Sequence, residues 1–160
     1  MATPSPYRSL PAARRIALVT HVLQSTREAR AVYAQRLAAK GGGFRAATVA
    51  TWPVDRLARE VVRLNAETPM DELDLLQTLY VDLEPAIQIT MLDAAGVPHE
   101  NGRMGEDLSM PYADEAAVRR AADAVRAAHG EDGERYLRTL AKYGAAGWPG
   151  IGAIVAERAG

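Results

Sequence analysis

Helix start signals built on proline recur along this chain and constrain its fold more than any other feature. Thr51-Trp52-Pro53 and Thr68-Pro69-Met70-Asp71-Glu72 each place proline where a first helical turn would begin, and acidic residues follow within that turn. Helical segments end at glycine, most clearly at Gly41-Gly42-Gly43 and at Gly96. Apolar residues between these signals recur with helical spacing. The pattern predicts an all-α protein.

Composition indicates how such helices would pack. The 160 residues include one Phe, two Trp and six Tyr, whereas alanine recurs throughout. Helices must therefore approach one another over small side chains, which favours a bundle. We expect five to seven helices around a central buried segment from about 69 to 95. Proline removes a helical hydrogen bond, so Pro85 should either kink this helix or mark the point where two helices meet. One domain would span 11–160, after a flexible arm at 1–10 that contains two prolines.

The chain has no cysteine, which excludes disulfides, thiolate zinc sites and cysteine nucleophiles. No stretch approaches the roughly 20 apolar residues needed to cross a bilayer. A reducing compartment and the absence of a membrane segment together predict a cytoplasmic protein.

Charge is unevenly distributed although the net charge is only −1. Residues 1–63 carry 11 Lys and Arg against 3 acids, and residues 64–116 carry one Arg against 12 acids. Opposite blocks of this size would steer docking within the chain or between subunits. The leading hypothesis is therefore a non-catalytic helical protein that forms homo-oligomers or docks a protein partner.

A basic ridge suggests another function. Arg56, Arg59 and Arg63 fall on one side of the predicted 53–66 helix, where they could form a nucleic-acid or polyanion surface. The ridge lacks interleaved aromatic residues, and the sequence pI is near 6.3. These two observations weigh against nucleic acid as the partner.

The 96–113 segment is rich in turn-forming residues and carries the main candidate ligand site. Its polar side chains could bind a small ligand or support an enzyme, with the histidine as a general base oriented by a carboxylate, or could bind a divalent metal with a further ligand. They are His99, Glu100, Asn101, Arg103 and Asp107. A surface crossing that satisfies its own backbone is the favoured alternative. The sequence has no Glu-x-x-His pair for a bundle metal site, and we predict no metal, cofactor or catalytic residues.

Overall fold

The protein is helical, as the sequence predicts. The computed structural model describes residues 4–40 and 43–159, in which there is no β-strand. Eight α-helices and one π-helix are present in this part of the chain, one α-helix more than the five to seven expected. They are α1 (Ala12–Ser25), α2 (Arg27–Ala39), α3 (Ala46–Val49), α4 (Val54–Arg63), α5 (Glu72–Gln77), the π-helix η1 (Thr78–Leu83), α6 (Pro85–Ala95), α7 (Glu115–Tyr143) and α8 (Ile151–Ala156).

The chain divides into two compact units, an N-terminal unit (Met1–Thr78) and a C-terminal unit (Leu79–Gly160). The expectation of one domain over 11–160 stays a prediction. Within the described residues, no helix combines the length and the apolar character that a membrane crossing requires.

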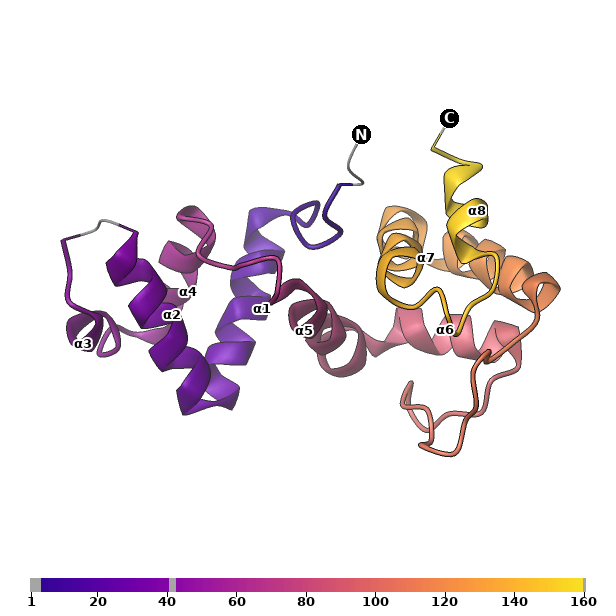
Figure 1. Ribbon diagram of the computed structural model, residues 1–160, viewed down its shortest axis with the longest axis horizontal. Helices are drawn as coiled ribbons and strands as arrows, with labels where there is room; N and C mark the ends of the chain where they lie inside the picture. The colour runs from indigo at the N-terminus through magenta and orange to yellow at the C-terminus, as the bar shows by residue number, and fades with distance from the viewer. Residues whose placement is uncertain (1–3, 41–42, 160) are drawn as a thin grey trace. The chain divides into compact units, whose positions relative to one another are not determined.

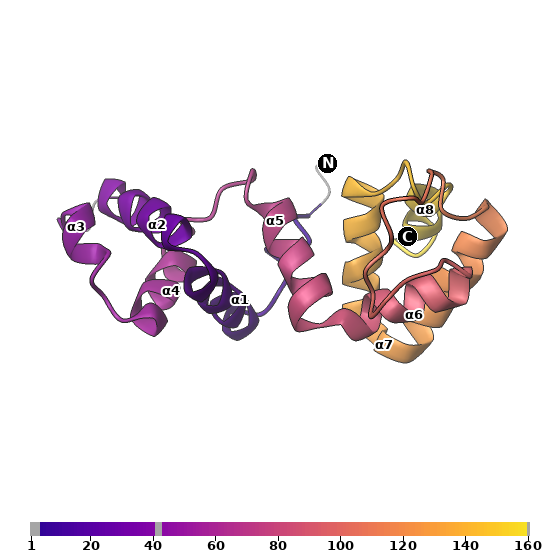
Figure 2. The ribbon, with the colours of Figure 1, turned by 90° about the horizontal axis from the view of Figure 1, so that it is seen from below.

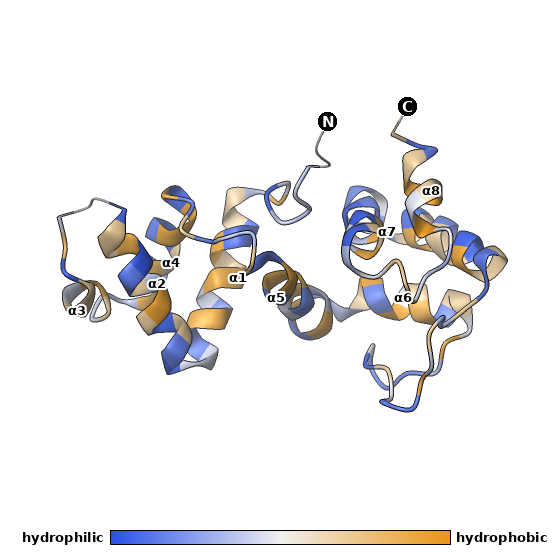
Figure 3. Cartoon of the chain, viewed as in Figure 1, coloured by the Kyte–Doolittle hydropathy of each residue, from blue (hydrophilic) through white to orange (hydrophobic). Residues whose placement is uncertain are grey.

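In the N-terminal unit, α1 packs against α2 and α4, and α3 packs against α2 (Figure 1). Thr26 starts α2 because its side chain accepts a hydrogen bond from the Ala29 N–H, which satisfies a free donor of the first turn. The helices carry both hydrophobic and hydrophilic bands (Figure 3). The apolar face of α4 is fully buried, with Leu57, Ala58 and Val61 at 0% exposure. Burial of this face is the main stabilisation that holds α4 on α1.

The segment before α1 differs from the loosely held arm that its prolines suggested. Tyr7 and Leu10 are 2% and 3% exposed. The Tyr7 N–H donates to the carboxylate of Glu72 at 3.1 Å. Residues 4–10 are thus packed against their unit, whereas residues 1–3 of the expected arm lie outside the described residues.

The expected central helix from 69 to 95 consists of three segments. α5 passes into η1, in which the Glu84 N–H bonds to the Leu79 carbonyl five residues earlier at 2.6 Å. Pro85 then occupies the first turn of α6, where its missing N–H costs nothing. The proline therefore begins a new helix and does not kink a continuous one.

In the C-terminal unit, α6 lies along α7, and α8 packs on α7 (Figure 2). α7 has two arms, because Gly130 between them has φ 54° and ψ −127° and interrupts the helix. Arg126 of the first arm and Glu134 of the second form an ion pair of 2.7 Å, and Arg126 also donates to the Ile154 carbonyl at 3.1 Å. These bonds tie both arms to α8.

Candidate functional site

The 96–113 segment contains a tight β-turn that places the candidate ligand residues. Glu100 and Arg103 exchange two backbone hydrogen bonds of 2.9 Å. The two residues between them, Asn101 and Gly102, have φ values of 51° and 85°, as a two-residue type I′ turn requires. Gln88 of α6 donates to the Gly102 carbonyl at 2.5 Å and holds the turn on that helix. Asn101 therefore contributes to the turn through its left-handed backbone conformation.

His99 uses both ring nitrogens within the fold. Nδ1 accepts the Gly102 N–H at 3.1 Å, so Nε2 carries the proton in the neutral ring and donates it to Asp93 at 2.7 Å. The imidazole is 13% exposed, whereas the Asp93 carboxylate is 67% exposed. In this arrangement His99 fixes the turn to α6 and has no ring nitrogen free for a general base or a metal ligand.

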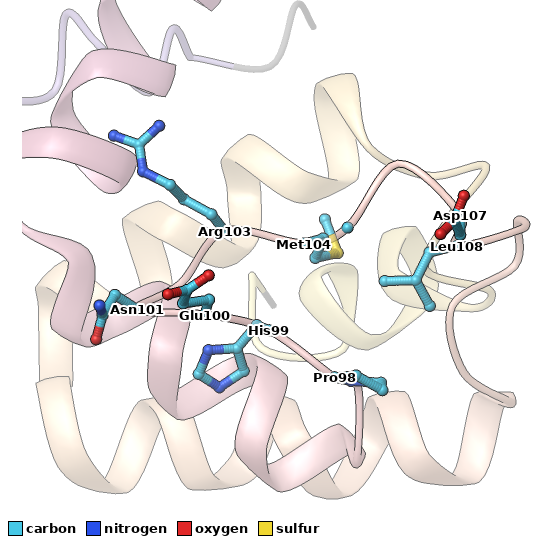
Figure 4. Close-up of a pocket in the computed structure, with 9 residues that line it drawn as sticks. Pro98, His99, Glu100, Asn101, Arg103, Met104, Asp107 and Leu108 are labelled. Atoms are coloured by element: carbon cyan, nitrogen blue, oxygen red, sulfur yellow. The ribbon is translucent and has the colours of Figure 1, made fainter.

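The other polar candidates surround an open hollow and do not converge on it. Arg103 turns away from the hollow and pairs with Asp82 of η1 at 2.6 Å (Figure 4). Glu100 and Asp107 are exposed at different places on the rim (Figure 4). The hollow has a volume of about 760 Å³, and Pro98, Met104 and Leu108 supply its apolar lining. No group of three or more metal-binding side chains occurs among the described residues.

The three predicted ridge arginines on α4 are exposed, but two of them are paired along the helix. Arg59 bonds to Asp55 at 3.1 Å, and Arg63 bonds to Glu60 at 2.6 Å. Hydrogen bonding from Arg63 lowers the pKa of Glu60 and outweighs the opposing effect of burial. Two of the three ridge charges are therefore neutralised by acids of their own helix.

Arg56, the third ridge residue, belongs to a surface cluster that the sequence did not reveal. Its guanidinium lies 4.0 Å from the centre of the Trp52 ring, a cation–π contact between positions i and i+4. Phe44 meets the same indole edge-on, at 5.2 Å between ring centres and 80° between planes. We call Phe44, Trp52 and Arg56 the aromatic–arginine patch. In the sequence, the four-residue spacing between Trp52 and Arg56 could have indicated their contact. No sequence pattern indicated that Phe44 would join them.

Local structure holds the patch in place. Trp52 precedes Pro53, the N-cap residue of α4, and Arg30 of α2 donates to the Trp52 carbonyl at 3.2 Å. Part of the indole packs on the unit's core, whereas the Phe44 side of the patch is open, with Phe44 48% exposed. Arg45, next to Phe44, is also exposed. The result is a partly exposed aromatic surface flanked by cations.

A buried polar cluster in the same unit was also missed by sequence reasoning. The Tyr7 hydroxyl donates to Glu67 at 2.5 Å, and Arg8 lies 3.6 Å from the other oxygen of that carboxylate, which is 1% exposed as a side chain. Burial, and then the hydrogen bond to Glu67, raise the pKa of Tyr7. Ser5 donates to the buried carboxylate of Glu72. The cluster ties the N-terminal segment to Glu67 and to Glu72, the first residue of α5.

A second ion pair links the oppositely charged sequence blocks. Arg36 of α2 makes two hydrogen bonds, of 2.5 Å and 3.3 Å, to Asp71 before α5. Partial burial opposes ionisation of Asp71, but hydrogen bonds from Arg36 and Thr68 outweigh it and lower the pKa overall. Together with the Arg8–Glu67 pair, this contact joins residues of the basic block to residues of the acidic block.

Comparison of the chain with protein-family models, with curated proteins and with solved structures finds no match. The chain is therefore classified only by its all-α fold.

Proposed function

We propose that this protein is a non-catalytic docking protein that binds an acidic protein surface, on a partner or on a second copy. The observation that carries the proposal is the aromatic–arginine patch. Phe44 leaves nearly half of its surface in water although it already packs on Trp52. Aromatic and arginine side chains are enriched at the energetic centres of protein interfaces, because they combine large contact area with directed polar contacts.

The positive net charge of the N-terminal unit supports its association with an acidic surface. Residues 1–78 hold 11 basic and 7 acidic side chains, and residues 79–160 hold 8 basic and 13 acidic ones. The net charges are therefore +4 and −5. Such a difference accelerates encounter with a complementary surface and weakens as salt screens it. The docking surface would act in the cytoplasm, which fits a chain without cysteine.

The state of the polar candidates supports a non-catalytic role. His99 is engaged at both nitrogens, and Arg103 is paired with Asp82. General acid–base catalysis needs a group that can reach a substrate proton at hydrogen-bond distance. The contacts of these two side chains instead secure the turn at Asn101 and Gly102.

Sedimentation velocity tests the proposal directly. We expect the purified chain, over a concentration series at about 50 mM salt, to self-associate or to bind an acidic protein partner, and to dissociate at about 500 mM salt. Affinity capture at both salt concentrations identifies a partner if the chain alone is monomeric. A chain that remains monomeric at low salt and captures no partner contradicts the proposal.

Small-ligand binding at the hollow is the second candidate function. Its apolar lining from Met104 and Leu108 beside carboxylates at Glu100 and Asp107 is the observation that favours it. A thermal-shift screen would find ligands, and Leu108→Arg should abolish any shift. Glu100→Gln should weaken only cationic or hydrogen-bond-donating ligands.

Polyanion binding through Arg56, Arg59 and Arg63 is the remaining candidate. The pairs with Asp55 and Glu60 reduce the positive charge available to phosphates. Binding of a single-stranded oligonucleotide at about 50 mM salt that falls steeply with added salt would support it.

A further inference from the structure

We infer that the acidic segment of residues 105–111 in a second copy of this chain docks on the aromatic–arginine patch. This inference rests on the proposed docking function and names the partner. It is carried by the complementary chemistry of two exposed surfaces that the same chain provides.

The patch is suited to a ligand that offers both a carboxylate and an apolar side chain. The guanidinium of Arg56 lies over the Trp52 ring at 4.0 Å and is exposed, and a planar guanidinium can bind a carboxylate through its N–H donors while it contacts an aromatic face. Phe44 presents an exposed ring to an apolar group, and exposed Arg45 adds a second cation. From Arg56 to the centre of the Phe44 ring, the patch extends at most about 9 Å.

The 105–111 segment offers these two features at a matching separation. Glu106 and Asp107 are exposed, and Met110 is 62% exposed. Met110 lies three positions after Asp107 and four after Glu106, which corresponds to about 10–13 Å in a fully extended chain and less in a bent one. The flexible thioether of methionine makes favourable contacts with aromatic rings. Carboxylate on Arg56 and Met110 on Phe44 would satisfy both partners.

The observations favour an acidic peptide segment over nucleic acid. Arg59 and Arg63 are neutralised by Asp55 and Glu60, so α4 does not present a row of free cations for successive phosphates. The patch offers one stacked guanidinium beside apolar surface, which matches a short segment with few charges. A second copy supplies such a segment at the same concentration as the patch itself.

Charge reversal with mixing tests the inference by sedimentation velocity at about 50 mM salt. Arg56→Glu reverses the charge of the aromatic–arginine patch. The double variant Glu106→Arg with Asp107→Arg reverses the charges of the 105–111 segment. We expect each variant alone to self-associate at least fivefold more weakly than the parent. Mixing them should restore association, because one intact patch then meets one intact segment. Arg59→Glu is the matched control on α4 and should associate like the parent.

The remaining outcomes separate this inference from the proposed function. If the parent self-associates and the Arg56→Glu and Arg59→Glu variants are weakened equally, or not at all, the inference is wrong and the docking function stands. If Phe44→Ser leaves the dimer unchanged, the inference also fails. A parent that is monomeric and captures no partner contradicts both. Tight oligonucleotide binding that Arg56→Glu abolishes, without self-association, replaces the inference with nucleic-acid recognition. Circular dichroism confirms that each variant is folded.

Discussion

The Tyr7 hydroxyl lies 2.5 Å from a carboxylate oxygen of Glu67 and joins segments that are 60 residues apart. Both side chains are buried, Tyr7 at 2% exposure and Glu67 at 4%. A carboxylate removed from water at this depth needs hydrogen-bond donors to offset its desolvation. Tyr7 supplies one donor, so the segment before α1 contributes to the stability of the N-terminal unit.

Tyr7→Phe should therefore destabilise the protein by about 1–3 kcal/mol, because it leaves the buried Glu67 carboxylate without its donor. Urea denaturation followed by circular dichroism measures the change. Tyr112→Phe is the control, since Tyr112 is only partly buried and should lose about 0.5 kcal/mol or less. A Tyr7→Phe variant as stable as the parent would show that the hydroxyl contributes nothing.

The Arg36–Asp71 pair should make stability depend on pH. Because the pKa of folded Asp71 lies below its ordinary value of 3.8, its contribution is present above that value and is lost as pH falls through the lower folded pKa. Asp71→Asn should cost about 0.5–1 kcal/mol at pH 7, since the pair is partly exposed, and nearly nothing at the acid end. Unfolding free energies of parent and variant at pH 7, 4 and 3 measure this.

Asp74→Asn controls for the loss of a negative charge near the start of α5. Asp74 is exposed and belongs to the same first turn. A gap between parent and Asp71→Asn that stays constant from pH 7 to pH 3 would contradict the assigned ion pair.

The type I′ turn makes Gly102 sensitive to substitution. Gly102 has φ +85°, and an added Cβ would lie 3.3 Å from Ile89 Cγ1. Gly102→Ala should lower stability by about 1–2 kcal/mol through backbone strain. Gly105→Ala is the matched control, because a Cβ there meets nothing within 4 Å. Thermal denaturation of both variants tests this prediction. Equal melting temperatures would contradict the type I′ turn at Gly102.

The two arms of α7 approach each other closely at Gly133, so substitution there should also lower stability. A Cβ there would lie 2.6 Å from the Val125 carbonyl oxygen, so Gly133→Ala forces backbone movement and should cost about 1–3 kcal/mol. Gly152 in α8 has open space around it, and Gly152→Ala should stabilise by about 0.5–1 kcal/mol. Chemical denaturation compares them. Destabilisation by Gly152→Ala, or none by Gly133→Ala, would contradict this packing.

Local signals in the sequence were sufficient for the all-α class and for several helix ends. Thr26 caps α2, and Gly96 ends α6 in the left-handed conformation, as residues of these types do in general. The segment around Pro85 was harder, because a proline inside an apolar run is equally compatible with a kinked helix and with a new helix start. The choice depended on η1, whose hydrogen-bond pattern leaves no periodic signal over six residues.

The candidate sites were less predictable because they depend on contacts between the loop and the helical segments before it. The roles of His99 and Arg103 are set by Asp93 and Asp82, which lie on other helical segments. Nothing near Phe44 indicated that its ring would meet Trp52. The charge blocks did indicate that basic and acidic residues would meet, but which residues pair, as in Arg36–Asp71, follows from helix packing.

Gly130 decides the shape of the longest helical stretch. Its φ and ψ lie in a region that residues with a Cβ rarely adopt. With an ordinary residue there, the 29 residues from Glu115 to Tyr143 would favour a straight rod of about 44 Å. Tyr136 would then move away from Tyr80, whose ring it meets at 4.8 Å. Because glycine lacks a Cβ, residue 130 allows the two arms of α7 to fold back on each other instead of continuing as one straight helix.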